Sequence, residues 1–261
     1  MVIDPVGGAS TIITIVTAIA TIRQGAIDMR TSTVITGASS GLGKCIAREM
    51  SVNSRDDGSG IINWSLDTGV DIRSKASIEK AVANLGDVKI DILINCASIN
   101  GINFLPDVTE EEFDNIVNTN IKGHFLTTQA LAEKLRGGTM LSICSNASHI
   151  PMTSSLAYNL SKAAQVMMVK QLSRELVKTH DITVFGISPN KLKNTGMSAY
   201  IDHKVQELRG WTAEEARNYQ LQSLPAGTET DPETLAEFIS FLLSSKERHR
   251  YFAGCIIPYG L

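Results

Sequence analysis

The sequence predicts an α/β fold in which one parallel sheet is covered by helices on both faces. Short runs of apolar and β-branched residues alternate with longer segments of helical periodicity along most of the chain. Repeated strand–helix units of this kind form parallel sheets joined by right-handed crossovers. A glycine-rich turn follows the first strand directly and opens a helix. The 261 residues, 43% of them apolar, are enough for one well-packed domain.

The positions of the elements follow from periodicity and from helix-start signals. Strands are expected at residues 33–36, 61–66, 90–95, 140–144, 182–187 and 255–258. Helices are expected at residues 42–50, 74–85, 109–136, 156–179 and 232–243. Ser74 suits an N-cap, Thr109 and Glu112 match a capping box, and Pro232 occupies the first position of its helix.

Charge and composition narrow the class of partner. The net charge is −3, the sequence pI is near 6.0, and the basic residues are dispersed along the chain. This balance gives no indication of nucleic-acid binding. Only 5% of the residues are aromatic, which also disfavours base stacking. Small organic molecules are therefore the expected partners.

The cysteines predict a reducing environment. Cys45, Cys96, Cys144 and Cys255 are far apart in the sequence, and three of them lie in apolar strand-like runs. Neither they nor the five histidines show metal-ligand spacing, so no metal is expected. We interpret the cysteines as small buried apolar residues, which predicts a cytoplasmic protein.

Residues 36–43, Thr-Gly-Ala-Ser-Ser-Gly-Leu-Gly, have the properties of a phosphate-binding turn. The glycines permit tight backbone geometry and let a diphosphate approach the chain. The N-terminus of the following helix offers N–H groups and a partial positive charge. In its strand–turn–helix context the turn predicts a Rossmann-type, doubly wound domain. The candidate cofactor-binding residues of the turn are Gly37, Ser39, Ser40, Gly41, Leu42 and Gly43.

Tyr158 and Lys162 are four residues apart on a predicted helix and therefore share one face. An ammonium group near a phenol stabilises the phenolate and lowers a pKa that is ordinarily about 10, so that tyrosine becomes a usable acid or base. Tyr-x-x-x-Lys also arises by chance as a surface pair. Ser145 ends the preceding strand, where open α/β sheets bind ligands. Ser142 and Ser148 compete with it for that place.

Together these motifs resemble those of the short-chain dehydrogenase/reductase family, in its compact branch with a Gly-x-x-x-Gly-x-Gly turn. The resemblance covers about residues 31–261. The family places its catalytic serine 13 residues before the tyrosine, which is the spacing of Ser145 and Tyr158. It also places an asparagine in the preceding long helix, and Asn120 fits that position better than Asn118. Four positions in the right order are far more specific than any one of them.

The resemblance implies an enzyme, an NAD(P)-dependent oxidoreductase that transfers a hydride between the nicotinamide and a carbonyl or secondary alcohol. Tyr158 would give the proton to the carbonyl oxygen or take it from the alcohol. Lys162 would hold the nicotinamide ribose and lower the pKa of the tyrosine. Ser145 would hydrogen-bond the substrate oxygen. Asn120 would support a water molecule that links Lys162 to solvent.

Further cofactor contacts are implied by the same resemblance. Asp71 and Ile72 match the pair that contacts the adenine, and Leu192 and Thr195 match contacts to the nicotinamide carboxamide. Asp67 follows the second strand, where an acidic side chain bonds the ribose 2′-hydroxyl and repels a 2′-phosphate. Because no Arg or Lys lies inside the glycine turn, NAD(H) is favoured over NADP(H).

Several positions depart from the family pattern. The usual Asn-Asn-Ala-Gly after the third strand is replaced by Asn95, Cys96, Ala97 and Ser98. The usual Pro-Gly after the fifth strand is Pro-Asn, and Asn190 is expected to keep the turn because asparagine tolerates left-handed geometry. Thr195 lies one place later than the family pattern, and the chain between the glycine turn and Asp71 is short.

The domain organisation follows from these assignments. Residues 29–261 are expected to form one catalytic domain, in which residues 195–225 are a substrate-loop insertion. Residues 1–28 are an N-terminal extension of uncertain structure, too polar for a membrane span. Because the first strand begins soon after Met29, that methionine is a candidate natural start.

Substrate and assembly are less specified by the sequence. Residues 146–153 and 195–225 are expected to line the substrate pocket, with His149, Met152, Met197 and Tyr200 as candidate contacts. The family resemblance implies a homodimer or homotetramer formed through the two long helices. A non-catalytic NAD(P)-binding regulator or scaffold of the same fold is the main alternative, motivated by Ser98 and Asn190. A sugar-nucleotide epimerase or dehydratase is a weaker one, since those relatives are usually longer.

Overall fold

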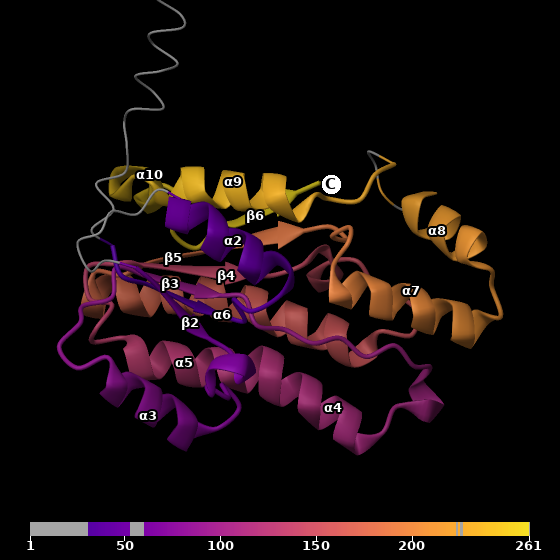
Figure 1. Cartoon of the computed structure of the whole chain (residues 1–261), viewed down its shortest axis with the longest axis horizontal. Coiled ribbons are helices and arrows are strands. Elements are labelled where there is room, and N and C mark those ends of the chain that lie inside the picture. The colour runs from indigo at the N-terminus through magenta and orange to yellow at the C-terminus, as the bar shows by residue number, and fades with distance from the viewer. Residues whose placement is uncertain (1–30, 53–59, 223, 225–226, 261) are drawn as a thin grey trace, which may run out of the picture.

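The computed structural model describes residues 31–52, 60–222, 224 and 227–260. The expectations for residues 1–28, including a start at Met29, lie outside the described residues. A six-stranded sheet runs through the middle of the molecule, with helices on both of its faces (Figure 1). The strand order is β2-β1-β3-β4-β5-β6, and every neighbouring pair is parallel. The predicted α/β class, a doubly wound parallel sheet, is confirmed.

The elements have these bounds. The strands are β1 (Thr33–Thr36), β2 (Ile61–Trp64), β3 (Ile92–Asn95), β4 (Thr139–Ile143), β5 (Thr183–Pro189) and β6 (Ile256–Tyr259). The α-helices are α2 (Gly41–Val52), α3 (Lys75–Asn84), α4 (Glu110–Val117), α5 (His124–Leu131), α6 (Leu156–His180), α7 (Gly196–Arg209), α8 (Ala213–Gln222), α9 (Pro232–Leu243) and α10 (Lys246–Arg250). Short helical turns are η1 (Leu66–Thr68), η2 (Leu105–Asp107), η3 (Asn118–Gly123) and η4 (Asn146–Ser148).

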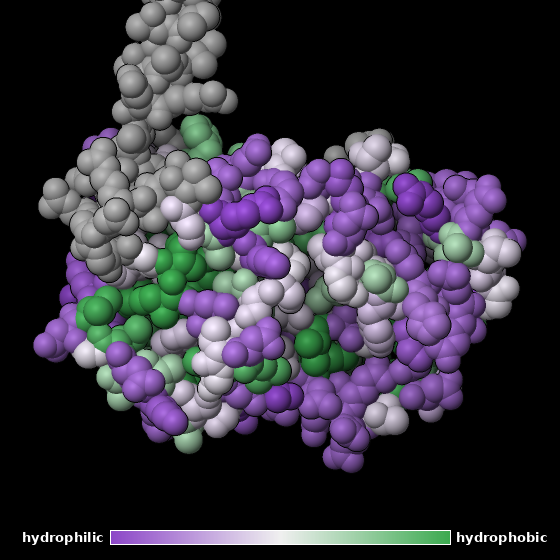
Figure 2. All heavy atoms as spheres, viewed as in Figure 1, coloured by the Kyte–Doolittle hydropathy of each residue, from purple (hydrophilic) through white to green (hydrophobic). Residues whose placement is uncertain are grey.

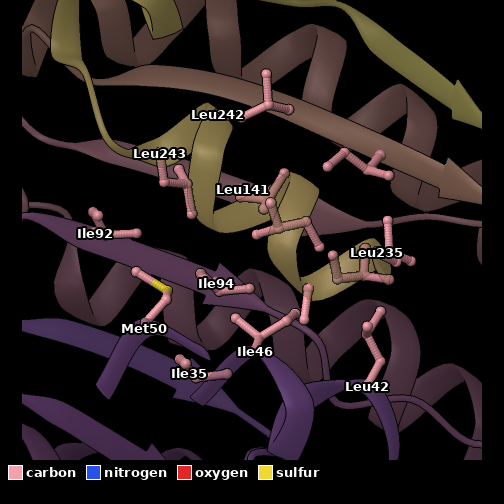
Figure 3. Packing of buried hydrophobic residues seen from close by; sticks show 14 of the residues in the cluster. Ile35, Leu42, Ile46, Met50, Ile92, Ile94, Leu141, Leu235, Leu242 and Leu243 are labelled. Atoms are coloured by element: carbon pink, nitrogen blue, oxygen red, sulfur yellow. The ribbon is translucent and has the colours of Figure 1, made fainter. Parts of the chain in front are cut away.

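Each face of the sheet has its own hydrophobic core, because alternate side chains of a strand point to opposite faces. On one face α2 and α9 pack over the strands, as the residues labelled in Figure 3 show. Ile35, Ile94 and Leu141 meet Ile46 of α2 and Leu235 of α9 there. On the other face Val34, Leu93, Met140 and Val184 pack against buried residues of α3, α5 and α6. Full burial of each such aliphatic side chain contributes about 2 kcal/mol, so the two cores fix the sheet that carries the site.

Helix-start signals in the sequence proved informative. The side chain of Ser74 caps α3 as expected. Pro232 begins α9 as expected, and the side chain of Asp231 caps that helix. Thr109 caps α4 by accepting a hydrogen bond from the backbone N–H of Glu112. The predicted capping box is only half formed, because the Glu112 carboxylate accepts a hydrogen bond from Asn103 Nδ2, at 2.5 Å.

The single helix expected over residues 109–136 is wrong in its interior and at its end. The structure divides it into α4, a π-helical turn η3, and α5, which ends at Leu131. A π-turn holds one extra residue per turn and is common at functional sites. Here it places Asn120 inside the protein, where its side chain bonds both the N–H and the carbonyl of Ile99, each at 2.9 Å.

The segment that interrupts the strand–helix alternation forms α7 and α8, which lie beyond the carboxyl end of β5 (Figure 1). Lys191 anchors these helices, since its ammonium contacts Asp202 of α7, Gln220 of α8 and Glu229. Figure 2 shows mostly hydrophilic surface over α7 and α8. In the described part, no helix is long and apolar enough to cross a membrane.

Candidate active site

The glycine turn is built so tightly that side chains are excluded at two positions. Gly37 has φ +73°, and a Cβ there would lie 2.8 Å from the Cα of Ala97. A Cβ on Gly43 would lie 2.3 Å from the carbonyl oxygen of Gly37. Gly41, at φ +51°, opens α2 and has free space where a Cβ would stand. The turn thus presents bare backbone at the N-terminus of a helix of 12 residues, which suits an anionic diphosphate.

The end of β3 is joined to this turn by hydrogen bonds. The hydroxyl of Thr36 accepts from the backbone N–H groups of Cys96 and Ala97, at 3.0 and 3.1 Å. Asn95 is fully buried and donates to the Thr128 hydroxyl. Its side-chain oxygen has no hydrogen-bond partner within the described residues. The Asn95 side chain is therefore enclosed between β3 and α5, and it is the backbone after β3 that meets the glycine turn.

The residues expected on the adenosine side occupy different environments. Ser65 follows β2 directly, and its hydroxyl lies 2.6 Å from that of Ser39 in the glycine turn. Asp67 lies in η1 with its side chain exposed. Asp71 is bound by Arg73, whose hydrogen bonds hold the pKa of the Asp71 carboxyl below its usual range. Ile72 is buried in the core under α3 and α5.

The expected acid/base group is assembled at the carboxyl end of β4. The Tyr158 ring is buried, with 8% of its surface exposed, and the Ser145 side chain is near enough to its phenol to oppose the rise in its pKa. The Lys162 ammonium lies 5.5 Å from the centroid of the same ring. Of the three candidate serines, Ser145 is thus the one placed against Tyr158, whereas Ser142 is enclosed within β4.

The electrostatics of this group differ from the sequence-based expectation. Burial raises the pKa of Tyr158 to about 12, opposed in part by the hydrogen bond from Ser145. Burial likewise lowers the pKa of Lys162 to about 8. The ammonium stands over the face of the ring, and desolvation is the largest cause of the rise in the tyrosine pKa. The expected lowering of the tyrosine pKa by the lysine is therefore not seen in the protein alone.

Asn120 is brought to the same place through two other residues. Its side chain donates to the Ser161 hydroxyl at 2.9 Å, and its backbone carbonyl accepts from Gln165 Nε2 at 2.7 Å. Lys162 Nζ donates to Gln165 Oε1 at 3.0 Å and to the carbonyl of Ile143 at 3.1 Å. Gln165 is not among the residues expected from the sequence. Its position, three residues after Lys162 on the buried face of α6, was the signal that could have found it.

The turn between β5 and α7 contradicts the expected conformation of Asn190 and shows how the extra residue before Thr195 is accommodated. Asn190 does not adopt left-handed geometry, because its backbone φ is not positive. Its buried amide instead accepts from the Thr230 N–H at 3.1 Å and donates to the Gly260 carbonyl at 2.6 Å. The extra residue before Thr195 is accommodated by Asn194, which has φ +55°. Thr195 then caps α7 through Ser198.

Other expected positions are more dispersed. Leu192 forms an isolated parallel bridge with Thr230 and packs against the core under α2 and α9. His149, Met152 and Tyr200 are exposed, and Met197 is half-buried. Cys255 is exposed, contrary to the interpretation of the cysteines as buried residues, whereas Cys144 is buried as expected.

Comparison with known proteins places this arrangement in a family. The family model for short chain dehydrogenases matches residues 54–206, more than half of the chain. The chain belongs to the short-chain dehydrogenase family. A curated relative, the NAD-dependent glycerol dehydrogenase of Listeria innocua, is 33% identical over 230 residues, which is 81% of this chain and 85% of the relative. A 3-oxoacyl-(acyl-carrier-protein) reductase of Mycobacterium bovis is 25% identical and covers 87% of this chain and 90% of its own.

Solved structures of the short-chain dehydrogenase fold agree with the architecture. An actinorhodin polyketide ketoreductase with NADPH superimposes with a TM-score of 0.76 at 23% identity, covering 89% of this chain and 97% of that one. A family protein from Francisella tularensis has a TM-score of 0.74 at 22% identity, covering 87% and 96%. Membership of the short-chain dehydrogenases makes this protein an NAD(P)-dependent oxidoreductase that acts on a small-molecule substrate.

Proposed function

We propose that this short-chain dehydrogenase interconverts a carbonyl and a secondary alcohol, with Tyr158 as the proton donor or acceptor. One observation carries the proposal: the Tyr158 phenol is buried beside Ser145, which opposes the rise in its pKa, while the Lys162 ammonium stands over the same ring. The three side chains converge at the carboxyl ends of the strands, where open α/β sheets bind their ligands.

Each residue has a separate part in this chemistry. Tyr158 Oη gives its proton to the substrate carbonyl oxygen, or takes the proton of the alcohol. The Ser145 hydroxyl holds the same substrate oxygen and stabilises the charge that develops on it. Lys162 supplies a positive charge that favours the tyrosinate. Asn120 supports Lys162 through the Gln165 amide, which connects the Asn120 carbonyl to the ammonium.

The tight glycines, where a Cβ would meet backbone atoms, fit a dinucleotide. The cofactor, when bound, supplies or accepts the hydride. The residues proposed to hold it are Gly37, Ser39, Ser40, Gly41, Leu42, Gly43, Asp67, Asp71, Ile72, Asn95, Cys96, Ala97, Lys162, Leu192 and Thr195. We favour NAD(H) over NADP(H), because Asp67 presents an exposed carboxylate just after β2 and the glycerol dehydrogenase relative is NAD-dependent.

The surroundings of the site suggest how substrate and subunits are accommodated. Residues 29–261 would act as one catalytic domain, in which residues 195–225 cover the substrate pocket. Exposed apolar side chains on α4, α5 and α6 support a homodimer or homotetramer formed through these helices; they are Phe113, Phe125, Leu156, Leu160 and Met167. All four cysteines are free, which fits the reducing cytoplasm.

The decisive experiment follows nicotinamide absorbance while the protein is mixed with NADH or NADPH and a panel of carbonyl compounds, and with NAD or NADP and glycerol and other secondary alcohols. We expect turnover by the wild type and its loss in Tyr158→Phe. The matched control is Tyr251→Phe, because Tyr251 is an exposed tyrosine. Binding of NADH without any turnover would instead favour the non-catalytic regulator or scaffold.

A further inference from the structure

A buried chain of polar side chains runs from Lys162 to the end of β3. Lys162, Gln165 and His124 are each at most 2% exposed. Lys162 Nζ donates to Gln165 Oε1, and Gln165 Nε2 lies 3.0 Å from His124 Nδ1. His124 Nε2 lies 2.7 Å from the carbonyl oxygen of Ala97. The acid/base group is thus connected to the loop that also hydrogen-bonds Thr36 of the glycine turn.

The protonation of His124 follows from its two partners. A carbonyl only accepts hydrogen bonds, so the hydrogen of the imidazole is on Nε2, facing Ala97. Burial lowers the pKa of His124 to about 4, so near neutral pH the ring is uncharged and Nδ1 is an acceptor. The atom of Gln165 that faces Nδ1 must therefore be the amide nitrogen.

This fixes which end of the amide faces the lysine. One hydrogen of Gln165 Nε2 goes to His124 Nδ1 and the other to the Asn120 carbonyl, which leaves Oε1 for the Lys162 ammonium. The flipped amide would set its hydrogens against the ammonium and its oxygen against two acceptors. Only one orientation satisfies every group, and buried polar groups are costly to leave unpaired.

We propose that Gln165 is the positioning residue of Lys162, and that neutral His124 holds the Gln165 amide in the orientation that Lys162 needs. The proposal rests on the proposed function, in which Lys162 serves Tyr158. Two of the three ammonium hydrogens go to the Ile143 carbonyl and to Gln165 Oε1. The third remains for the cofactor ribose. The Gln165 amide thus stands between Asn120 and Lys162, where the family resemblance implied a water molecule that links Lys162 to solvent.

The groups that face Lys162 decide what loss of the amide would do. The Tyr158 ring faces the ammonium. The titratable neighbours of Lys162 are Cys144 directly after β4, Cys96 in the loop after β3, and neutral His124 of α5. None of them is a carboxylate. An acceptor at Gln165 Oε1 therefore contributes directly to keeping the lysine charged, and the lysine charge in turn favours ionised Tyr158.

The kinetic test compares Gln165→Leu with Gln171→Leu, the same substitution on an exposed residue of the same helix. In alcohol oxidation we expect kcat to fall about tenfold in Gln165→Leu. The pH at which oxidation reaches half its maximum should rise by about one unit, because the tyrosine is ionised less readily. Gln171→Leu should match the wild type. A loss of kcat that is equal at every pH, with the midpoint unmoved, would overturn the proposal.

Two substitutions of His124 separate its two hydrogen bonds. His124→Asn keeps an oxygen near the place of Nδ1, where it can accept from Gln165, and should retain the wild-type midpoint. His124→Gln keeps a donor near the place of Nε2, for the Ala97 carbonyl, but loses the acceptor, and should behave like Gln165→Leu. The opposite ranking of the two variants contradicts the proposed role of His124.

An NMR measurement tests the proposed role of His124 without any turnover. Nitrogen NMR of the imidazole rings should show His124 protonated at Nε2 and unprotonated at Nδ1 at neutral pH, and the Nδ1 signal should move in Gln165→Leu but not in Gln171→Leu. A His124 that carries its hydrogen on Nδ1 refutes the proposed chain. A wild type that turns over nothing while this NMR pattern holds refutes only the acid/base function of Tyr158.

Discussion

Replacing His124 by Asn should make the protein less sensitive to acid. Burial lowers the pKa of His124 from 6.5 to about 4 in the folded protein. Between these values the unfolded chain binds a proton that the folded protein excludes. The contribution of neutral His124 to the free energy of unfolding is complete above pH 6.5 and is lost as the pH falls toward 4. From these two pKa values, the folded state loses about 2.5 kcal/mol between pH 7.5 and pH 4.5 through this residue alone.

Urea unfolding at pH 7.5 and pH 4.5 measures this effect. The wild type should lose about 2.5 kcal/mol more than His124→Asn between the two pH values, because the asparagine does not titrate. Carboxylates such as Asp71, whose pKa is lowered in the fold, contribute equally to both proteins and cancel in the difference. Identical pH dependence in the two proteins would show that folding leaves the pKa of His124 unchanged, and the argument from burial would be refuted.

Three further substitutions test the packing around the site. Gly43→Ala sets a Cβ 2.3 Å from a carbonyl oxygen of the glycine turn and should weaken NADH binding, followed by fluorescence, about tenfold or more. The control Gly60→Ala, whose Cβ meets open space, should bind NADH like the wild type. Equal binding by the two variants would contradict the role given to the turn. Lys191→Met removes the ion pair to Asp202 of α7. It should raise KM several-fold and speed proteolysis within residues 196–222, with kcat little changed. An unaltered cleavage rate would count against the anchoring role of Lys191. Leu235→Ala empties a fully buried position under α9 and should cost about 3 kcal/mol in urea unfolding, so a loss below 1 kcal/mol would mean that the core refills.

Much of the fold could be predicted because its signals are local. Ser74 and Pro232 mark helix starts, and the alternation of strands and helices gives the sheet. The π-turn within residues 118–123 could not be predicted, since it depends on Asn120 reaching Ile99, which lies far away in the sequence. Asn190 was misjudged for the same reason: its partners at residues 228–230 and 260 become neighbours only in the folded protein.

The candidate site, like the fold, could be predicted from the sequence only in part. Tyr158, Lys162 and Ser145 could be found from their spacing, because one helix and one strand end carry them. The amide and the imidazole that support Lys162 could not, since glutamine and histidine within helices usually signal nothing. Only their burial together, with every donor matched to an acceptor, distinguishes them. Likewise, the direction of the Tyr158 pKa depends on burial, which the Tyr-x-x-x-Lys spacing does not contain.

The corner at Asn190 has a consequence for motion. Its amide joins the end of β5 to Thr230 and Gly260, and Leu192 is bridged to Thr230. A glycine at this position would leave the backbone flexible, whereas the Asn190 side chain holds the turn against Thr230 and against Gly260, which follows β6. Any swing of α7 relative to the sheet must then bend the backbone after Leu192, and Asn194, already in a left-handed conformation, is the natural place for that rotation.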